Sequence, residues 1–134
     1  MKLLLDTNVL IAAFITKGVC SELLEHCLRH HEIVLAEFIL DELHKNLVKK
    51  FKYSVDDSDS VVRLLRLRVS LFETYPLPQP VCRDADDDMV IATALAGEAV
   101  CIVTGDKDLL ELKEHQGVVI LKPADFSAFE AEHS

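Results

Sequence analysis

Several features that would assign the chain to a common class are missing from its 134 residues. No apolar run approaches the length of a membrane span. The amino-terminal apolar run is short and broken at Asp6, unlike a secretory signal. The four cysteines form no CxxC pair and are too few for a disulfide framework. We therefore expect reduced cysteines, a cytoplasmic location and no membrane partner.

Positive charge is scarce as well, because the formal net charge is −9. This balance argues against a protein held on nucleic acid by a general excess of positive charge. The basic residues are nevertheless concentrated, since eight of the 14 lie between Lys45 and Arg83. The sequence is therefore compatible with a local basic surface on an acidic protein.

Several familiar catalytic motifs are also absent. The six histidines show neither HxH nor HExxH spacing, and there is no GxSxG and no GxxxxGK[ST]. These absences argue against a zinc peptidase, a serine hydrolase of the nucleophile-elbow type and a P-loop nucleotide-binding protein.

What the sequence does contain is an alternation of apolar runs with helical patterns. Strands are predicted at 2–5, 32–36, 99–106 and 118–122, and helices at 9–15, 21–31, 37–51, 56–72, 84–96, 108–116 and 123–132. The three prolines of residues 75–81 predict an irregular connection. Continuous apolar strands that alternate with helices are typical of a parallel sheet covered on both faces. We expect one domain over residues 1–134, a three-layer α/β/α sandwich with a mostly parallel sheet of four or five strands.

Acidic residues follow the predicted strands. Asp6 and Asp106 each end a strand, and Asp88 lies in the first turn of the helix at 84–96. Glu42 or Asp41 lies near the start of the helix that follows residues 32–36. In open α/β sheets, ligands bind beyond the carboxyl ends of the strands. Carboxylates gathered there repel one another, and a hard divalent cation such as Mg²⁺ or Mn²⁺ would remove that conflict.

Each acid also has a purely structural interpretation. Asp6 and Asp106 are suited to cap the helices that follow them, and the acids at 84–88 to complement a helix dipole. Helical periodicity places Glu42 opposite the apolar stripe of its helix, as a solvated residue. The coincidence of four acidic positions near strand ends favours a metal-dependent reaction. Two divalent ions about 4 Å apart can hold the attacking and leaving oxygens of a phosphodiester.

The segments LLLDTNVLI, ILDEL, DADDDMVIATALA and IVTGDKDLL occur in that order. In order and spacing they resemble PIN-domain ribonucleases, most closely the branch of toxins from toxin–antitoxin pairs, over about residues 2–122. The resemblance implies cleavage of single-stranded RNA with Mg²⁺ or Mn²⁺, a cognate antitoxin and homodimer formation.

The resemblance also implies roles for individual residues. It places the four catalytic acids at Asp6, Glu42, Asp88 and Asp106, with Asp6, Asp88 and Asp106 holding the metal. Asp88 is preferred over Asp86 and Asp87 because it stands at the proper distance before Ile91 and Ala92, and the choice among the three acids remains open. The supporting residues are Asn8, Thr104 and Asp108, and the lysines expected along the RNA backbone are Lys45, Lys49, Lys50 and Lys52.

Two other functions are compatible with the pattern. The first is a catalytically inactive PIN-like module that binds RNA or protein, although the presence of all four acids counts against it. The second is a phosphoaspartyl enzyme with Asp6 as nucleophile. That chemistry usually requires a second Asp two residues further on, where this chain has Asn8.

Overall fold

The centre of the sheet is built from apolar runs that are buried on both faces. Leu3, Leu4 and Leu5 are fully buried in the computed structural model, which describes residues 1–133. The strands are β1 (Lys2–Leu5), β2 (Glu32–Leu35), β3 (Ser70–Leu71), β4 (Cys101–Val103), β5 (Glu114–His115) and β6 (Val118–Leu121). Their order is β3-β2-β1-β4-β6-β5, and all neighbouring pairs are parallel except β5 with β6. The predicted mostly parallel sheet is confirmed.

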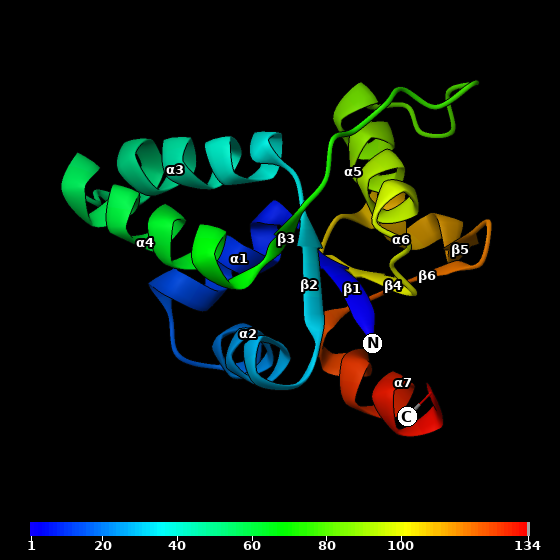
Figure 1. The fold of residues 1–134 in the computed structure, drawn as a ribbon, viewed down its shortest axis with the longest axis horizontal. Helices are drawn as coiled ribbons and strands as arrows, with labels where there is room; N and C mark the ends of the chain where they lie inside the picture. The colour runs from blue at the N-terminus through cyan, green and yellow to red at the C-terminus, as the bar shows by residue number, and fades with distance from the viewer. Residues whose placement is uncertain (134) are drawn as a thin grey trace.

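Helices cover both faces of this sheet. They are α1 (Thr7–Ile15), α2 (Val19–His30), α3 (Glu37–Phe51), α4 (Val55–Arg68), α5 (Ala85–Ala96), α6 (Lys107–Leu112) and α7 (Phe126–His133), the last preceded by a 3₁₀ turn at Pro123–Asp125. Figure 1 shows α1 to α4 on one side of the sheet and α5 with α6 on the other. The predicted α/β/α layers are therefore confirmed.

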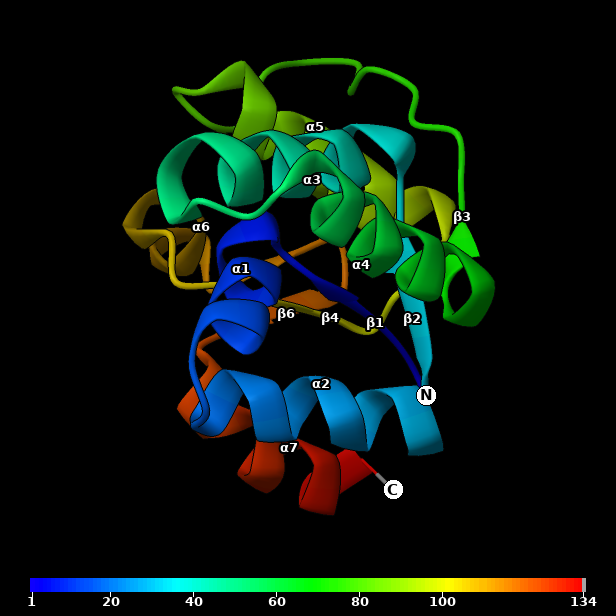
Figure 2. The ribbon, with the colours of Figure 1, turned by 90° about the vertical axis from the view of Figure 1, so that its left-hand side faces the viewer.

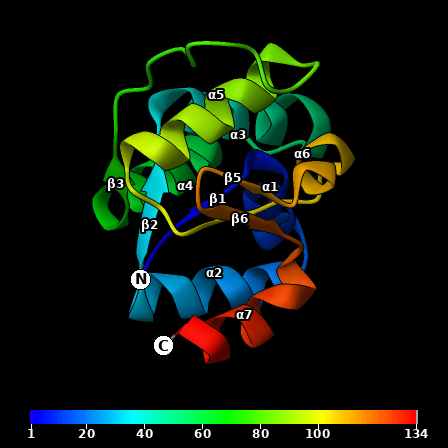
Figure 3. The ribbon, with the colours of Figure 1, turned by 90° about the vertical axis from the view of Figure 1, so that its right-hand side faces the viewer.

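The two side views show which elements meet at each end of the strands. α3 and α5 lie near the carboxyl ends of β1 and β2, whereas α2 and α7 lie side by side near the amino ends (Figures 2 and 3). Among residues 1–133, no single helix is long and apolar enough to cross a membrane; α1 and α2 meet that length and composition only as a pair, bent by 107°.

The sheet has six strands rather than the four or five expected, because two short edge strands formed where helix was predicted. Helix α4 ends at Arg68, and Ser70 then pairs with Val34 of β2. Helix α6 ends before Lys113, whose φ is 61°. Gln116 and Gly117, both with positive φ, form the two-residue turn between β5 and β6. Pairing with a distant strand is not visible in local periodicity, so both helices were predicted too long.

The connection between β3 and α5 is irregular, as the three prolines predicted. It leads into the first turn of α5, at the edge of the sheet where β1 and β4 also end. At the other end of α5, Gly97 packs directly on β2. The position of α5 against the sheet therefore depends on close contact at Gly97.

We expect Gly97→Ala to lower the free energy of unfolding by about 1–3 kcal/mol, the usual cost of overpacking. An added Cβ would collide with Cγ1 of Val34 and approach Cδ2 of Phe72 to 3.0 Å. Chemical denaturation of the purified variant measures the loss.

The matched control is Val34→Ala, which removes the colliding methyl groups. The double variant should lose less stability than the sum of the two single losses. If the two losses of stability simply add, the contact with Val34 is not what makes a side chain at residue 97 unfavourable.

Candidate active site

The candidate site begins where the central strand ends. Asp6 follows β1, caps α1 and is 7% exposed. Its Oδ1 accepts a hydrogen bond from the Thr7 amide at 2.8 Å, and its Oδ2 accepts one from the Thr104 hydroxyl at 2.8 Å. The expected capping role of Asp6 is therefore real, and it leaves this carboxylate at the carboxyl edge of the sheet.

Asn8 and Thr104 join the end of β1 to the end of β4. The Asn8 amide group donates to Oδ2 of Asp6 at 3.2 Å, and its carbonyl oxygen accepts from the Gly105 amide at 3.0 Å. Thr104 is fully buried, and its hydroxyl also accepts from the Asp106 amide at 3.0 Å. These bonds hold the backbone around Asp106 against Asp6. The positions of Asn8 and Thr104 are therefore suited to the supporting role expected of them.

Asp106 caps α6, as one interpretation of the sequence suggested. Its Oδ1 accepts from the amides of Asp108 at 2.8 Å and Leu109 at 3.4 Å. Carboxylate oxygens of Asp87, Asp106 and Asp108 all lie within 4.8 Å of one another. Asp108 is additionally paired with Arg83 at 2.8 Å. Three carboxylates thus converge on a small volume beside Asp6.

The third acid in this volume is Asp87, whereas the sequence favoured Asp88. Asp87 is 7% exposed and begins a buried face of α5 that continues through Val90, Ile91 and Ala94. The Asp88 carboxylate instead accepts hydrogen bonds from the amides of Cys82 at 2.8 Å and Val81 at 3.2 Å. Its contacts hold the proline-rich connection, so the structure does not bring Asp88 into the cluster.

The physical reason for this difference lies in the orientation of α5. A face that began at Asp88 would continue through Ala92 and Leu95, but Leu95 is only half-buried. Spacings of three, four and seven residues from Asp87 select Val90, Ile91 and Ala94, all of which are buried. From Asp88 the same spacings lead to Ile91, Ala92 and Leu95, which are apolar as well, so the sequence carried no signal that separates the two acids.

The carboxylates destabilise one another's charged forms. The pKa of Asp87 is raised to about 7, first by burial and then by the nearby charges of Asp106, Asp84 and Asp6 in that order. Burial also raises the pKa of Asp6, with a contribution from Asp106, against the hydrogen bonds that stabilise its charge. A site of this kind gains from a cation that replaces the missing positive charge.

Glu42 belongs to the same electrostatic environment. Burial raises its pKa first, followed by the charges of Asp86, Asp6 and Asp84. Its side chain is partly buried, whereas Asp41 is exposed. Periodicity predicted a solvated Glu42, but α3 packs beside α1, so this side of α3 faces the acids rather than open solvent.

The lysines expected to contact RNA lie along α3 and at its end. Lys45, Lys49, Lys50 and Lys52 are all exposed. Lys45 is close enough to Glu42 to lower its pKa. The row therefore begins near the acidic cluster and runs away from it toward the end of α3, where Lys52 adopts a left-handed conformation.

The donor set fits a hard divalent cation. It consists of carboxylate oxygens, which Mg²⁺ and Mn²⁺ prefer over nitrogen or sulfur. Among the residues that the structure describes, Arg83 is the sole basic side chain in an ion pair with any of Asp6, Asp87, Asp106, Asp108 or Glu42, and it contacts Asp108. The negative charge of the cluster is therefore largely uncompensated by the protein.

Three solved structures share this fold. VapBC-1 from nontypeable Haemophilus influenzae superposes with a TM-score of 0.63 at 19% identity, covering 92% of this chain and 99% of the other. VapBC2 from Rickettsia felis, solved bound to a DNA fragment from the VapBC2 promoter, superposes with a TM-score of 0.62 at 18% identity, covering 90% of this chain and 97% of the other. FitAcB from Neisseria gonorrhoeae gives 0.57 at 17% identity, covering 91% and 98%. At these identities the likeness shows the fold.

Sequence comparison identifies the family. An uncharacterized protein of Methanocaldococcus jannaschii, MJ1680, is 32% identical over 120 residues, which cover 85% of this chain and 76% of the relative. Residues 2–108 match the family model described as PIN domain. The match spans most of the sheet and every acid of the cluster, and the chain therefore belongs to the PIN domain family.

Proposed function

We propose that this protein is a metal-dependent endoribonuclease that cleaves single-stranded RNA and acts as the toxin of a toxin–antitoxin pair in the cytoplasm. The observation that carries the proposal is the convergence of Asp87, Asp106 and Asp108 at the carboxyl ends of the strands. Asp6 lies close enough for its charge to raise the pKa of Asp87. PIN domains are generally nucleases, and the whole chain, residues 1–134, would form one nuclease domain. The acids present are those that phosphodiester hydrolysis with divalent ions requires.

In this proposal Asp6, Asp87 and Asp106 hold Mg²⁺ or Mn²⁺, with Asp108 at the margin of the same site. When bound, the cation would polarise the phosphate and activate water. Asn8 and Thr104 keep the Asp6 carboxylate oriented through the hydrogen bonds described above. Glu42, whose pKa is raised, would accept a proton from the attacking water.

The substrate would approach a cluster of acids, so positive charge nearby is needed to hold its phosphates. We propose that the phosphates of the RNA backbone bind along α3 to Lys45, Lys49, Lys50 and Lys52. Binding of this kind weakens as salt rises, because each phosphate contact releases counterions. The row begins beside Glu42, which would direct the strand across the acids.

An antitoxin partner follows from the same proposal. The resemblance to toxins and the structural likeness to the VapBC and FitAcB complexes support such a partner. An Arg or Lys of that partner inserted among the carboxylates would supply the charge they lack. Homodimer formation is proposed from the resemblance alone.

The alternative is an inactive PIN-like module that binds RNA or protein. It has the same fold but needs neither a cation nor the raised pKa of Asp87. Measurements of RNA cleavage and of cation binding therefore distinguish the nuclease from the inactive module.

Asp87→Asn should reduce Mn²⁺-dependent cleavage of single-stranded RNA by about 100-fold or more, because it removes a charged ligand. Asp88→Asn is the matched control on the neighbouring residue. It should keep cleavage within about 10-fold and lose about 1 kcal/mol of stability, since Val81 and Cys82 lose a charged acceptor.

A gel assay on a labelled RNA, with circular dichroism as the test of folding, measures both variants. If Asp88→Asn were inactive and Asp87→Asn active, the sequence-based assignment of Asp88 would be restored. Equal cleavage by the wild type and both variants would exclude Asp87 as a required ligand. A wild-type protein that cleaves no RNA with either ion would favour the inactive module.

Mg²⁺ or Mn²⁺ should raise the melting temperature of the wild-type protein by about 5–10 °C at 100 times its Kd, because the ion binds only the folded state. Asp6→Asn and Asp87→Asn should abolish the shift. Asp41→Asn, an exposed acid on α3, should leave it unchanged. Differential scanning fluorimetry measures the melting temperature. If neither ion changes the melting temperature of the wild type, the proposed metal site is contradicted.

Without divalent ions, the stability of the wild type should fall between about pH 4 and pH 7 relative to Asp87→Asn. Asp87 in the folded state has a pKa of about 7, whereas the unfolded chain loses this proton near pH 4. The folded state therefore binds more protons in that interval, and the stabilising contribution of the protonated form disappears as pH rises through 7.

Urea denaturation in EDTA at pH 5 and pH 8 measures this effect. The difference in unfolding free energy between wild type and Asp87→Asn should change by about 2 kcal/mol between the two pH values. A difference that does not depend on pH would show that Asp87 is ionised throughout.

A further inference from the structure

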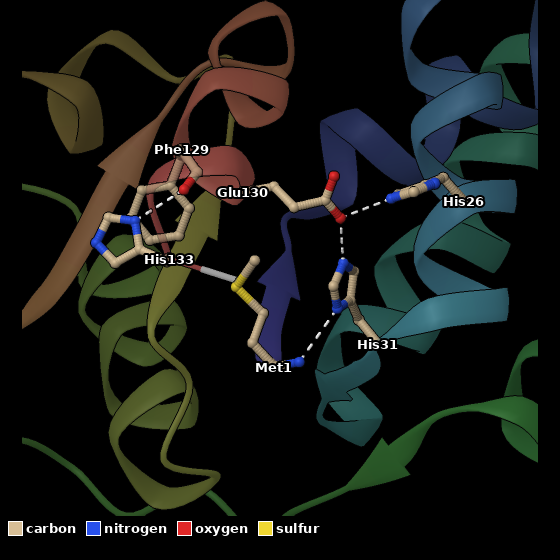
Figure 4. A network of polar contacts seen from close by, with 6 residues as sticks. All are labelled: Met1, His26, His31, Phe129, Glu130 and His133. Carbon is tan, nitrogen blue, oxygen red and sulfur yellow. Dashed lines mark hydrogen bonds and ion pairs between the residues drawn. The ribbon is translucent and has the colours of Figure 1, made fainter.

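A second cluster of ligand-type side chains lies at the opposite edge of the sheet from the acids. His26 is in α2, His31 follows α2 just before β2, and Glu130 is in α7. Oε2 of Glu130 lies 2.6 Å from Nε2 of His26 and 2.5 Å from Nε2 of His31. Figure 4 shows the carboxylate between the two imidazole rings. The contacts join segments about 100 residues apart in the chain.

The partners of Glu130 are unusual for a simple ion pair. Among residues 1–133, both side chains within ion-pair distance of its carboxylate are imidazoles, and neither a Lys nor an Arg joins them. Hydrogen bonds from His26 and His31 lower the pKa of Glu130, so the carboxylate is ionised and accepts from both rings. Two imidazole nitrogens and one carboxylate oxygen that meet at one point form a donor set that Zn²⁺ uses in proteins.

The ligand atoms are accessible and differ in exposure. A cavity of about 360 Å³ opens onto His26 and Glu130, with Phe126 and Leu23 also in its wall. The side chain of His26 is 42% exposed and that of Glu130 is 25% exposed. The side chain of His31 is 9% exposed and forms the buried end of the group. An ion has a path to the cluster, and water has room to complete its coordination.

The buried histidine is oriented by its surroundings. The ring of Phe126 packs edge-on against His31, with 5.9 Å between ring centroids. The nitrogen of Met1 is hydrogen-bonded to Nδ1 of His31 at 3.1 Å, which leaves Nε2 to face Glu130 (Figure 4). In the ion-free state Nδ1 of His31 accepts from the Met1 ammonium group. A ligating histidine instead donates from its second ring nitrogen, so the direction of this hydrogen bond must reverse when Nε2 binds an ion.

We propose that His26, His31 and Glu130 form a binding site for a divalent transition-metal ion, best matched by Zn²⁺, that clamps α7 to α2. All three ligand atoms lie within 4.8 Å of one another. Tetrahedral zinc with bonds near 2.1 Å needs ligands about 3.4 Å apart. Glu130 would therefore withdraw by under about 1 Å as an ion entered, which its partly exposed side chain allows.

Binding must displace the hydrogen bonds now present. Because the ionised carboxylate can only accept, each Nε2 carries a proton in the ion-free state. When Nε2 turns its lone pair to the ion, each ring must carry its proton on Nδ1. At His26 the proton moves from Nε2 to Nδ1. At His31 the Met1 ammonium group passes a proton to Nδ1 and then accepts a hydrogen bond from it, while the Nε2 proton leaves to solvent. The site is independent of the proposed nuclease activity, since it lies at the other end of the strands and uses nitrogen ligands that Mg²⁺ does not prefer.

The test is calorimetric titration of the full chain with ZnCl₂, in an Asp87→Asn background that weakens the acidic cluster. One equivalent of Zn²⁺ should bind and raise the melting temperature. His26→Ala and Glu130→Gln, each added to that background, should weaken binding by at least about 10-fold. Co²⁺ in place of Zn²⁺ should give the visible absorption bands of a four-coordinate site, and His26→Ala should remove them.

His133→Ala is the matched control, because His133 lies in the same helix as Glu130. Its ring stacks on Phe129, and its Nδ1 is bonded to the Phe129 carbonyl, away from Glu130 (Figure 4). This variant should bind Zn²⁺ as its parent does. The proposal is overturned if the parent binds no Zn²⁺, or if binding survives both ligand variants. It is also overturned if Glu130→Gln lowers the melting temperature equally with and without Zn²⁺. The three side chains would then stabilise the contact between α7 and α2 without an ion.

Discussion

The parallel pairing of β1 with β4 is the constraint on which the candidate active site depends. Leu5 lies beside Val103 in this pair, so the residues that follow both strands emerge together at one edge of the sheet. The hydroxyl of Thr104 then reaches the carboxylate of Asp6, and Asn8 bonds to both segments. The buried groups of Asp6 and Thr104 are satisfied by these bonds, which allows a carboxylate to be held where its burial would otherwise be costly.

The electrostatic conflict of the site follows from that geometry. Once β1 and β4 place Asp6 and Asp106 side by side, the first turn of α5 brings Asp87 against them. The protein supplies little positive charge there, apart from Arg83 on Asp108. Repulsion between buried carboxylates is typical of functional sites. In a purely structural role, replacing one of these acids by a neutral residue would raise the stability of the protein.

The two ends of the sheet carry different chemistry. Oxygen donors gather at the carboxyl ends of β1 and β4, whereas two imidazoles and one carboxylate gather near the amino ends of β1 and β2. Hard cations prefer the first set and zinc the second. The proposed clamp on α7 would let a transition metal stabilise the fold without competing for the acids.

Much of this protein was determined by local sequence. Continuous apolar strands that alternate with helical patterns determined the three-layer fold, and α3 was predicted at its observed bounds because its apolar stripe is regular. Acids placed at strand ends likewise predicted where the site would lie. Only the tertiary structure decided that Asp87 rather than Asp88 faces Asp106, that Glu42 is partly buried, and that β3 and β5 form. It also decided that Glu130 meets His26 and His31. Each of these outcomes depends on the rotation of a helix or on pairing between distant segments, and neither is encoded in the spacing of neighbouring residues.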